Sequence, residues 1–155
     1  MLKYCETEIV FREFPDEITL AINIANCPHR CVGCHSPHLQ TDCGDTLDEK
    51  AIDKLVGPVK NLITCVGLMG GDSEPESVVR IAKYIKKSYP GIKVGVYSGN
   101  YELPVEDTLS AIDYIKIGPY IDCLGPLDSE TTNQKLYKIT DGRLEEIKVT
   151  KSQAK

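Results

Sequence analysis

Three cysteines lie within one short stretch, Cys27–Cys34, and their thiolates could hold a metal ion or a cluster. The spacing is C-x3-C-x2-C, and Pro28, His29 and Gly33 stand among the intervening residues. Thiolates are soft ligands that suit iron–sulfur clusters, zinc or copper(I). A [4Fe–4S] cluster usually takes four cysteines. The three thiols of this loop would therefore leave one iron open to another ligand.

A zinc site is the alternative, because cysteine pairs often bind structural zinc. Such sites usually bring a second C-x2-C pair, whereas the other cysteines of this chain stand singly. A histidine near the loop could complete a Cys3His site, so the ligand types leave both readings open. The single cysteines are Cys5, Cys43, Cys65 and Cys123, and the nearby histidines are His29, His35 and His38.

Gly70-Gly71-Asp72 is a second stretch with a chemical use. Two glycines allow a close approach of the backbone to a ligand, and Asp72 adds an acceptor for a cationic amine. On its own the motif is also typical of a strand-to-helix turn with Asp72 as a capping acid. Ser98 could likewise bind a ligand or serve as a turn residue, and Lys116 at a strand end is either a carboxylate partner or a solvated lysine.

Composition limits the class of protein. The chain has 155 residues, 41% of them hydrophobic, with a net charge of -5 and a pI of about 5.2. Length favours one domain over residues 1–155, and the acidic balance argues against nucleic-acid binding. No apolar run reaches the roughly 18 residues that a membrane helix needs. The chain has seven cysteines, and its N-terminus does not show the apolar core of a signal peptide. Together these features indicate a reducing compartment, so we expect a cytoplasmic protein.

Hydrophobic periodicity predicts alternating strands and helices. Apolar and polar residues alternate over 17–24, and apolar runs at 62–68, 92–97 and 114–117 also read as strands. Helices are predicted from a capping box at Thr46 to about Val56, after Ser73 to about Tyr89, and over 105–112. The remaining predictions are an N-terminal strand over 8–14, a loop over 118–133, a hairpin of 135–139 with 144–149, and a disordered tail over 150–155.

Such alternation implies right-handed crossovers and a mostly parallel sheet. A complete eight-fold barrel takes about 250 residues, so the predicted fold is α/β, a short partial (β/α) barrel. Ligands bind at the carboxyl ends of parallel strands. The cysteine loop, Gly70–Asp72, Ser98 and Lys116 each follow or end a predicted strand, so we expect them on one rim.

The sequence CPHRCVGCHSP at 27–37 resembles the signature of the radical S-adenosylmethionine (SAM) superfamily. Its context is similar to the activating enzymes for anaerobic, class III ribonucleoside-triphosphate reductase. Many superfamily members have an aromatic residue before the last cysteine, whereas this chain has Gly33, as the activase branch does. A late segment with Gly118-Pro119-Tyr120 and Asn133-Gln134 is also typical of that branch, so the resemblance covers most of the chain.

The resemblance implies that Cys27, Cys31 and Cys34 hold a [4Fe–4S] cluster and that SAM chelates the fourth iron. It further implies that Asp72, in place of the glutamate of a Gly-Gly-Glu motif, contacts the SAM amino group. Cluster-dependent cleavage of SAM would give a 5′-deoxyadenosyl radical, which takes a hydrogen atom from a glycine of the reductase. The residues implied to bind the cofactor are Gly33, Cys34, His35, Gly70, Gly71, Asp72 and Ser98.

The implied partners are the large subunit of the reductase and a one-electron donor such as flavodoxin or ferredoxin. Two other functions stay open at this point. One is a different radical SAM enzyme, either another glycyl-radical activase or an enzyme of the carboxy-deazaguanine synthase type. The other is a non-enzymatic zinc-binding module.

Overall fold

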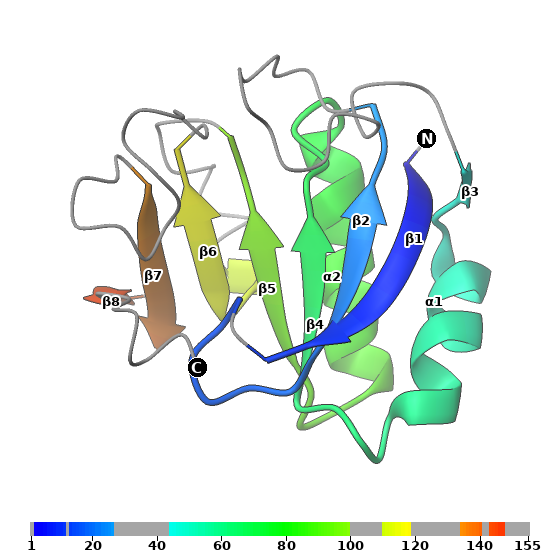
Figure 1. The fold of residues 1–155 in the computed structure, drawn as a ribbon, viewed down its shortest axis with the longest axis horizontal. Coiled ribbons are helices and arrows are strands. Elements are labelled where there is room, and N and C mark those ends of the chain that lie inside the picture. The colour runs from blue at the N-terminus through cyan, green and yellow to red at the C-terminus, as the bar shows by residue number, and fades with distance from the viewer. Residues whose placement is uncertain are drawn as a thin grey trace.

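The structure is a computed structural model, and it describes residues 2–11, 13–26, 44–99, 110–118, 134–140 and 143–147. Within these ranges eight strands form one sheet in the order β3-β1-β2-β4-β5-β6-β7-β8 (Figure 1). The strands are β1 (Lys3–Val10), β2 (Thr19–Ile24), β3 (Asp45–Thr46), β4 (Cys65–Met69), β5 (Lys93–Tyr97), β6 (Tyr114–Ile117), β7 (Lys135–Thr140) and β8 (Arg143–Ile147).

The sheet is mixed. Strands β2, β4, β5 and β6 run parallel to one another, whereas β1 lies antiparallel to β2 and β3. The β7–β8 hairpin continues the other side in antiparallel order. The parallel part is therefore the central four strands, and the N-terminal strand and the hairpin extend it at both sides. The curvature of a partial barrel stays a prediction.

Two helices pack against the core on one face of this sheet: α1 (Glu49–Val56) and α2 (Pro75–Ser88). In Figure 1, α2 lies behind the strands and α1 lies beside β1. Their apolar faces pack against every second residue of the strands, because side chains alternate between the two faces of a strand. Ile22 of β2, Leu68 of β4 and Ile81 of α2 are fully buried in this core. The α/β character of the chain thus follows from helical stripes that cover one side of the sheet.

The starts of both helices differ from the predicted ones. Thr46 belongs to β3, where it pairs with Lys3, so it does not cap α1. The N-cap is Asp48, whose carboxylate accepts a hydrogen bond of 2.9 Å from the N–H of Ala51. Helix α2 begins at Pro75, and Ser73 lies outside it. In the first case, pairing with a distant strand overrides a local capping pattern.

The other predicted elements have mixed outcomes. Strand β6 and the β7–β8 hairpin are confirmed, with ends that shift by up to two residues. The first strand was expected over 8–14 but occupies Lys3–Val10. Residues 105–109 of the predicted third helix, residues 119–133 of the predicted loop, and the tail at 150–155 lie outside the described residues. In the described part of the chain, no helix has the length and apolar character needed to cross a membrane.

The second face of the sheet is filled by the connection between β1 and β2. Phe14 in this connection is completely buried and packs its ring against Tyr97, at a centroid distance of 5.3 Å, and Tyr114, at 5.2 Å. Room for the ring comes from Gly67 of β4 and Gly95 of β5, which are paired neighbours in the sheet. A side chain at Gly95 would overlap the Phe14 ring.

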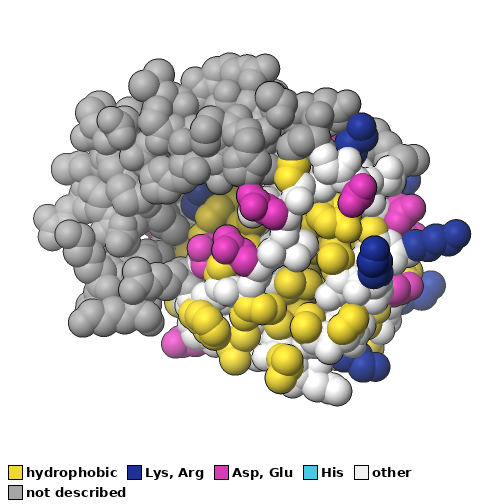
Figure 2. All heavy atoms as spheres, turned by 45° about the vertical axis from the view of Figure 1, so that its right-hand side comes forward, with side chains coloured by type: hydrophobic (Ala, Val, Ile, Leu, Met, Phe, Trp, Pro, Cys, Tyr) yellow, Lys and Arg dark blue, Asp and Glu magenta, His cyan; other side chains and the backbone are white. Residues whose placement is uncertain are grey.

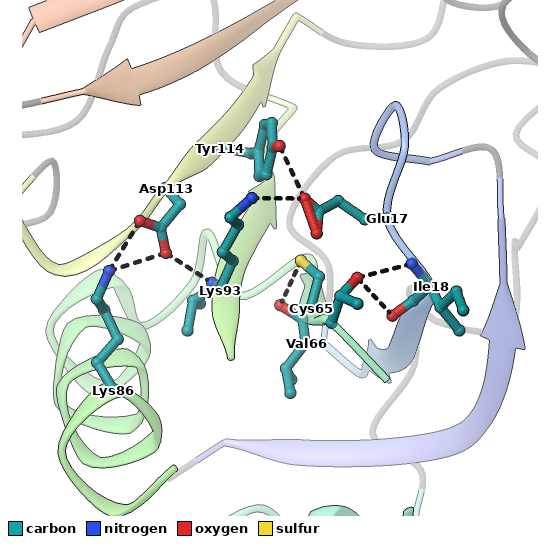
Figure 3. Close-up of polar contacts among 10 residues, drawn as sticks. Glu17, Ile18, Cys65, Val66, Lys86, Lys93, Asp113 and Tyr114 are labelled. Carbon is teal, nitrogen blue, oxygen red and sulfur yellow. Dashed lines mark hydrogen bonds and ion pairs between the residues drawn. The ribbon is translucent and has the colours of Figure 1, made fainter. Parts of the chain in front are cut away.

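Buried polar contacts hold the same connection at the N-terminal ends of the parallel strands (Figure 3). The Glu17 carboxylate accepts hydrogen bonds of 3.0 Å from the Lys93 ammonium and from the Tyr114 hydroxyl. Only 5% of the Glu17 side chain is exposed. Burial, with help from Glu17, raises the pKa of Tyr114, so its hydroxyl stays protonated and donates. These contacts explain why a connection without regular structure takes one defined course.

We predict that Gly95→Ala destabilises the protein by about 1–3 kcal/mol, because the new methyl group overlaps the Phe14 ring in a packed core. The control is Gly57→Ala. Gly57 has a helical φ of -49°, and its added Cβ would lie 4.0 Å from the hydroxyl oxygen of Tyr89. Such a change should be neutral or stabilising by up to about 1 kcal/mol. Urea unfolding of both variants measures the difference; equal effects would contradict the packing described for Phe14.

Candidate functional site

Four parallel strands end at the same edge of the sheet, at the top of Figure 1. Because parallel strands share a direction, the residues that follow them gather along this edge. Gly70 follows β4, Ser98 follows β5 and Gly118 follows β6. Asn26, which has a positive φ of 62°, follows β2 and leads the chain toward Cys27. We call this edge the strand-end rim.

Gly70 and Gly71 adopt a backbone that side chains rarely allow. Their φ angles are 120° and 96°, in the region that glycine enters without strain. A Cβ at Gly71 would also overlap Val78 of α2, and one at Gly70 would lie 3.4 Å from the carbonyl oxygen of Ile24. The N–H of Gly70 donates to the Tyr97 carbonyl at 3.1 Å. The two glycines thus let the chain turn from β4 into α2 while it stays close to both neighbouring strands.

Asp72 and Ser98 are brought together across this rim. The Ser98 hydroxyl donates to Oδ1 of Asp72 at 2.7 Å, and the Gly99 N–H donates to Oδ2 at 2.8 Å. Ser98 is itself 8% exposed, and its N–H donates to the Lys116 carbonyl at 2.8 Å. Each oxygen of the carboxylate accepts one of these bonds, so together they orient Asp72.

The contacts of Asp72 show whether it caps helix α2, which was the alternative role for this residue. The N-cap position of α2 is taken by Glu74, whose side chain makes no capping hydrogen bond. Asp72 instead accepts from the end of β5, which is a neighbour in space and lies 26 residues further along the chain. The carboxylate therefore joins two strand ends at the rim.

Tyr97 and Lys116 form a second pair near the rim. The Lys116 ammonium lies 4.0 Å from the centroid of the Tyr97 ring, a cation–π contact. The Tyr97 hydroxyl donates to the Glu13 carbonyl at 2.8 Å, and burial raises the pKa of this tyrosine. Tyr97 was missed by the sequence analysis. The sequence gives only a weak indication of this role, because an aromatic residue at the end of a strand is usually interpreted as part of the core.

The loop residues predicted to bind the cluster and SAM lie outside the described residues: Cys27, Cys31, Cys34, Gly33 and His35. Two of the cysteines that stand singly in the sequence are described. Cys65 is a free, fully buried thiol whose pKa is raised to about 12 by burial. Cys5 is disulfide-bonded. Neither offers the accessible thiolate that an iron cluster requires.

The donor set fits a cluster rather than an oxygen-ligated ion. In residues 2–11, 13–26, 44–99, 110–118, 134–140 and 143–147, no group of three or more His, Cys, Asp or Glu side chains could hold a metal ion. The thiols of Cys27, Cys31 and Cys34, which the sequence predicts as ligands, come after β2 in the chain, and Cys27 is three residues beyond Ile24. Soft thiolates at this spacing suit iron–sulfur chemistry.

A family model described as a 4Fe-4S single cluster domain matches residues 18–144. The matched range begins just before β2 and ends within the β7–β8 hairpin, so it includes the three clustered cysteines and the entire strand-end rim. No curated protein matched the chain, and no solved structure did. The match agrees with the predicted [4Fe–4S] cofactor.

We predict that anaerobic reconstitution loads about four iron atoms per chain, as a [4Fe–4S] cluster requires. Cys31→Ala should remove most of this iron, because it deletes one of three clustered thiolates. The matched control is Cys65→Ala, which should keep its iron since the Cys65 thiol is buried and protonated. Iron analysis and the visible absorption of the cluster measure both. Equal iron loss in the two variants would contradict the assignment of the ligands.

Proposed function

This chain belongs to the family of 4Fe-4S single cluster domains, and from this premise we propose that it is a radical SAM enzyme. Its proposed task is to activate an anaerobic ribonucleoside-triphosphate reductase by forming a glycyl radical. The observation that carries the proposal is the pairing at the rim: a Gly-Gly-Asp turn, with Asp72 oriented by Ser98, beside the strand that leads into the cysteine loop.

In this proposal Cys27, Cys31 and Cys34 would hold the cluster and leave it open to SAM. When bound and reduced, the cluster would supply the electron for cleavage of SAM, the chemistry needed to remove a hydrogen atom from a glycine Cα of the partner. The protein's own part is to hold SAM in one orientation and to exclude solvent from the radical. A fourth cysteine is not needed, in keeping with the motif.

Asp72 is the proposed partner of the SAM ammonium group. Its carboxylate is held by Ser98 and Gly99, so it would meet the cation without first losing side-chain freedom. A charge-assisted hydrogen bond of this kind contributes roughly 1.5–3 kcal/mol. Ser98 would then act by positioning Asp72. Gly70 and Gly71 allow the backbone turn that would bring Asp72 to SAM. Gly33 and His35 are the proposed neighbours of the adenine.

The packing of Phe14 bears on where the substrate would enter. Phe14, Tyr114 and Leu136, with the partly buried Tyr97 packed against them, fill the face of the sheet that α1 and α2 do not cover. A substrate is therefore proposed to approach from the strand-end rim. The proposed substrate is a protein segment carrying the target glycine, because the chain's own side chains fill the face of the sheet without helices.

The remaining parts of the proposal follow from the same assignment. The large subunit of the reductase would be the partner, flavodoxin or ferredoxin would supply the electron, and the cytoplasm would be the compartment. The family match weakens the zinc alternative, because its model is that of an iron–sulfur domain. Another radical SAM activity would keep the cluster and SAM but act on a different substrate. The EPR spectrum of the reductase, described below, distinguishes that case.

We predict that Asp72→Asn weakens SAM binding about tenfold to a hundredfold, since roughly 1.4 kcal/mol corresponds to one decade of affinity. Asparagine can still accept from Gly99 and donate to Ser98, so the fold and the cluster should persist while the charge is lost. The matched control is Glu76→Gln, which also replaces a carboxylate by an amide, in the first turn of α2. Binding is measured by equilibrium dialysis of SAM with the reconstituted protein. Unchanged affinity in Asp72→Asn would refute a contact with the ammonium.

We further predict that the protein, its cognate reductase, SAM and a reductant together produce an organic doublet in the EPR spectrum of the reductase under anaerobic conditions. Deuterium placed at the target glycine Cα should appear in the 5′-deoxyadenosine. Cys31→Ala serves as the control that forms neither product. Formation of 5′-deoxyadenosine without the doublet would retain the radical SAM chemistry and reject the activase role.

A further inference from the structure

The face of the sheet that α1 and α2 do not cover carries its side chains in successive rows across the strands. Residues two apart in a strand lie on the same face. Gly67 and Gly95 are paired in one row, where the Phe14 ring packs. The next row toward the strand-end rim joins β2, β4, β5 and β6 through paired neighbours. We call it the upper row, and it consists of Asn23, Met69, Tyr97 and Lys116.

Among the described residues, the upper row is the part of this face that a ligand from the rim would meet first. Its side chains are all half-buried, whereas Ala21, Gly67 and Gly95 in the row beneath are buried. Phe14 closes that lower row and is itself fully buried. Figure 2 shows hydrophobic side chains gathered in its lower half, which is the end of the molecule away from the rim. That apolar surface therefore lies off the route from the rim to the upper row.

Asn23 differs from the other members of the upper row. Met69 and Tyr97 pack against the cluster around Phe14, and the Lys116 ammonium lies over the Tyr97 ring, so packing accounts for these three. Asn23 carries the only polar side chain within Leu20–Ala25, although asparagine is disfavoured in strands. A polar side chain in an otherwise apolar strand is the kind of exception that indicates binding.

The place of Asn23 relates it to both parts of the proposed site. Along the chain, it comes four residues before Cys27, on the strand that leads into the cysteine loop. Across the sheet, it is the paired neighbour of Met69, the last residue of β4 before Gly70. The cysteine loop thus follows Asn23 itself, and the Gly-Gly-Asp turn follows its neighbour.

A glycine in a polypeptide is an unusual target, because it has no side chain by which a protein can recognise it. Recognition therefore depends on the peptide groups on either side of its Cα, each of which offers an N–H donor and a C=O acceptor. The side-chain amide of asparagine carries a matching acceptor oxygen and donor nitrogen. Met69 beside Asn23 adds an apolar contact that adapts its shape to a neighbour.

We propose that Asn23 binds the polypeptide substrate by pairing its side-chain amide with a peptide group next to the target glycine. The glycine segment then lies along the upper row, over Met69 and Tyr97. Asn23 has this role only if the proposed activase function holds. It adds to that function a residue for the substrate, whereas Asp72 and Ser98 serve SAM.

The test measures glycyl-radical formation in the cognate reductase by EPR, at varied reductase concentration and saturating SAM. Asn23→Leu keeps the approximate size of the side chain and removes both hydrogen-bonding groups. We expect its KM for the reductase to rise about tenfold, which corresponds to roughly 1.4 kcal/mol. Asn23→Asp, which keeps an acceptor and loses the donor, should also raise this KM. Iron content and the dissociation constant for SAM should stay at their wild-type values in both variants.

A second readout separates binding of the glycine from a purely structural role. With a reductase deuterated at its glycine Cα atoms, the share of 5′-deoxyadenosine that carries deuterium should fall by about half or more in Asn23→Leu, because a misplaced glycine reacts less often. Lower stability alone would reduce the amount of active protein and leave this share unchanged. The matched control is Asn61→Leu, which replaces an exposed asparagine in the connection before β4, at the opposite end of the parallel strands. It should change neither KM nor the deuterium share.

Several results would overturn this role of Asn23. These are an unchanged KM and deuterium share in Asn23→Leu, or equal losses in Asn61→Leu. Weaker SAM binding that accounts for the whole loss would assign Asn23 to the SAM site instead. If the wild-type protein cleaves SAM but forms no glycyl radical, the activase function itself fails, and the role of Asn23 fails with it. The wild-type reaction therefore shows which of the two proposals is wrong.

Discussion

The packing of one aromatic ring against two glycines is the contact on which the rest of the structure depends. The parallel register sets Ala21, Gly67 and Gly95 in one row across β2, β4 and β5. Phe14 occupies the space that these small residues leave and is fully buried there. The ring thus closes the face of the sheet that α1 and α2 do not cover, and it does so with a residue from a connection.

This contact also helps to distinguish the two ends of the parallel strands. At their N-terminal ends, the buried Glu17 carboxylate binds Lys93 and Tyr114, and the Tyr114 ring stacks on Phe14. Toward the C-terminal ends, the chain turns through Gly70 and Gly71, and Asp72 is held by Ser98. Tyr97 connects the two ends, since its ring packs on Phe14 and lies under Lys116.

The rim illustrates how a site can be ordered before its ligand arrives. Asp72 receives one hydrogen bond from a side chain and one from the backbone of the next strand end. A carboxylate held in this way loses little freedom on meeting a cation, which is the general advantage of an ordered site. The position of Asp72 therefore depends on the register of β4 and β5 as much as on its own sequence motif.

Much of this protein could be predicted from its sequence, because the signals concerned are local. The thiols of 27–34 are close in the chain, so their ligand chemistry needs no fold to be recognised, and the family match agrees with it. Strand β6 and the β7–β8 hairpin were likewise evident from short apolar runs and a turn. The alignment of Gly70, Ser98 and Gly118 along one edge followed from the rule that parallel strands end together.

Only the tertiary structure decided the rest, because it depends on contacts between residues far apart in the chain. Thr46 of β3 pairs with Lys3 of β1, although the residues around Thr46 predict that it caps a helix. The bond between Ser98 and Asp72, and the space for Phe14 at Gly67 and Gly95, exist only when β4 and β5 lie side by side. A pattern within a few residues reports local preference, whereas burial and strand pairing are set by neighbours that the pattern does not contain.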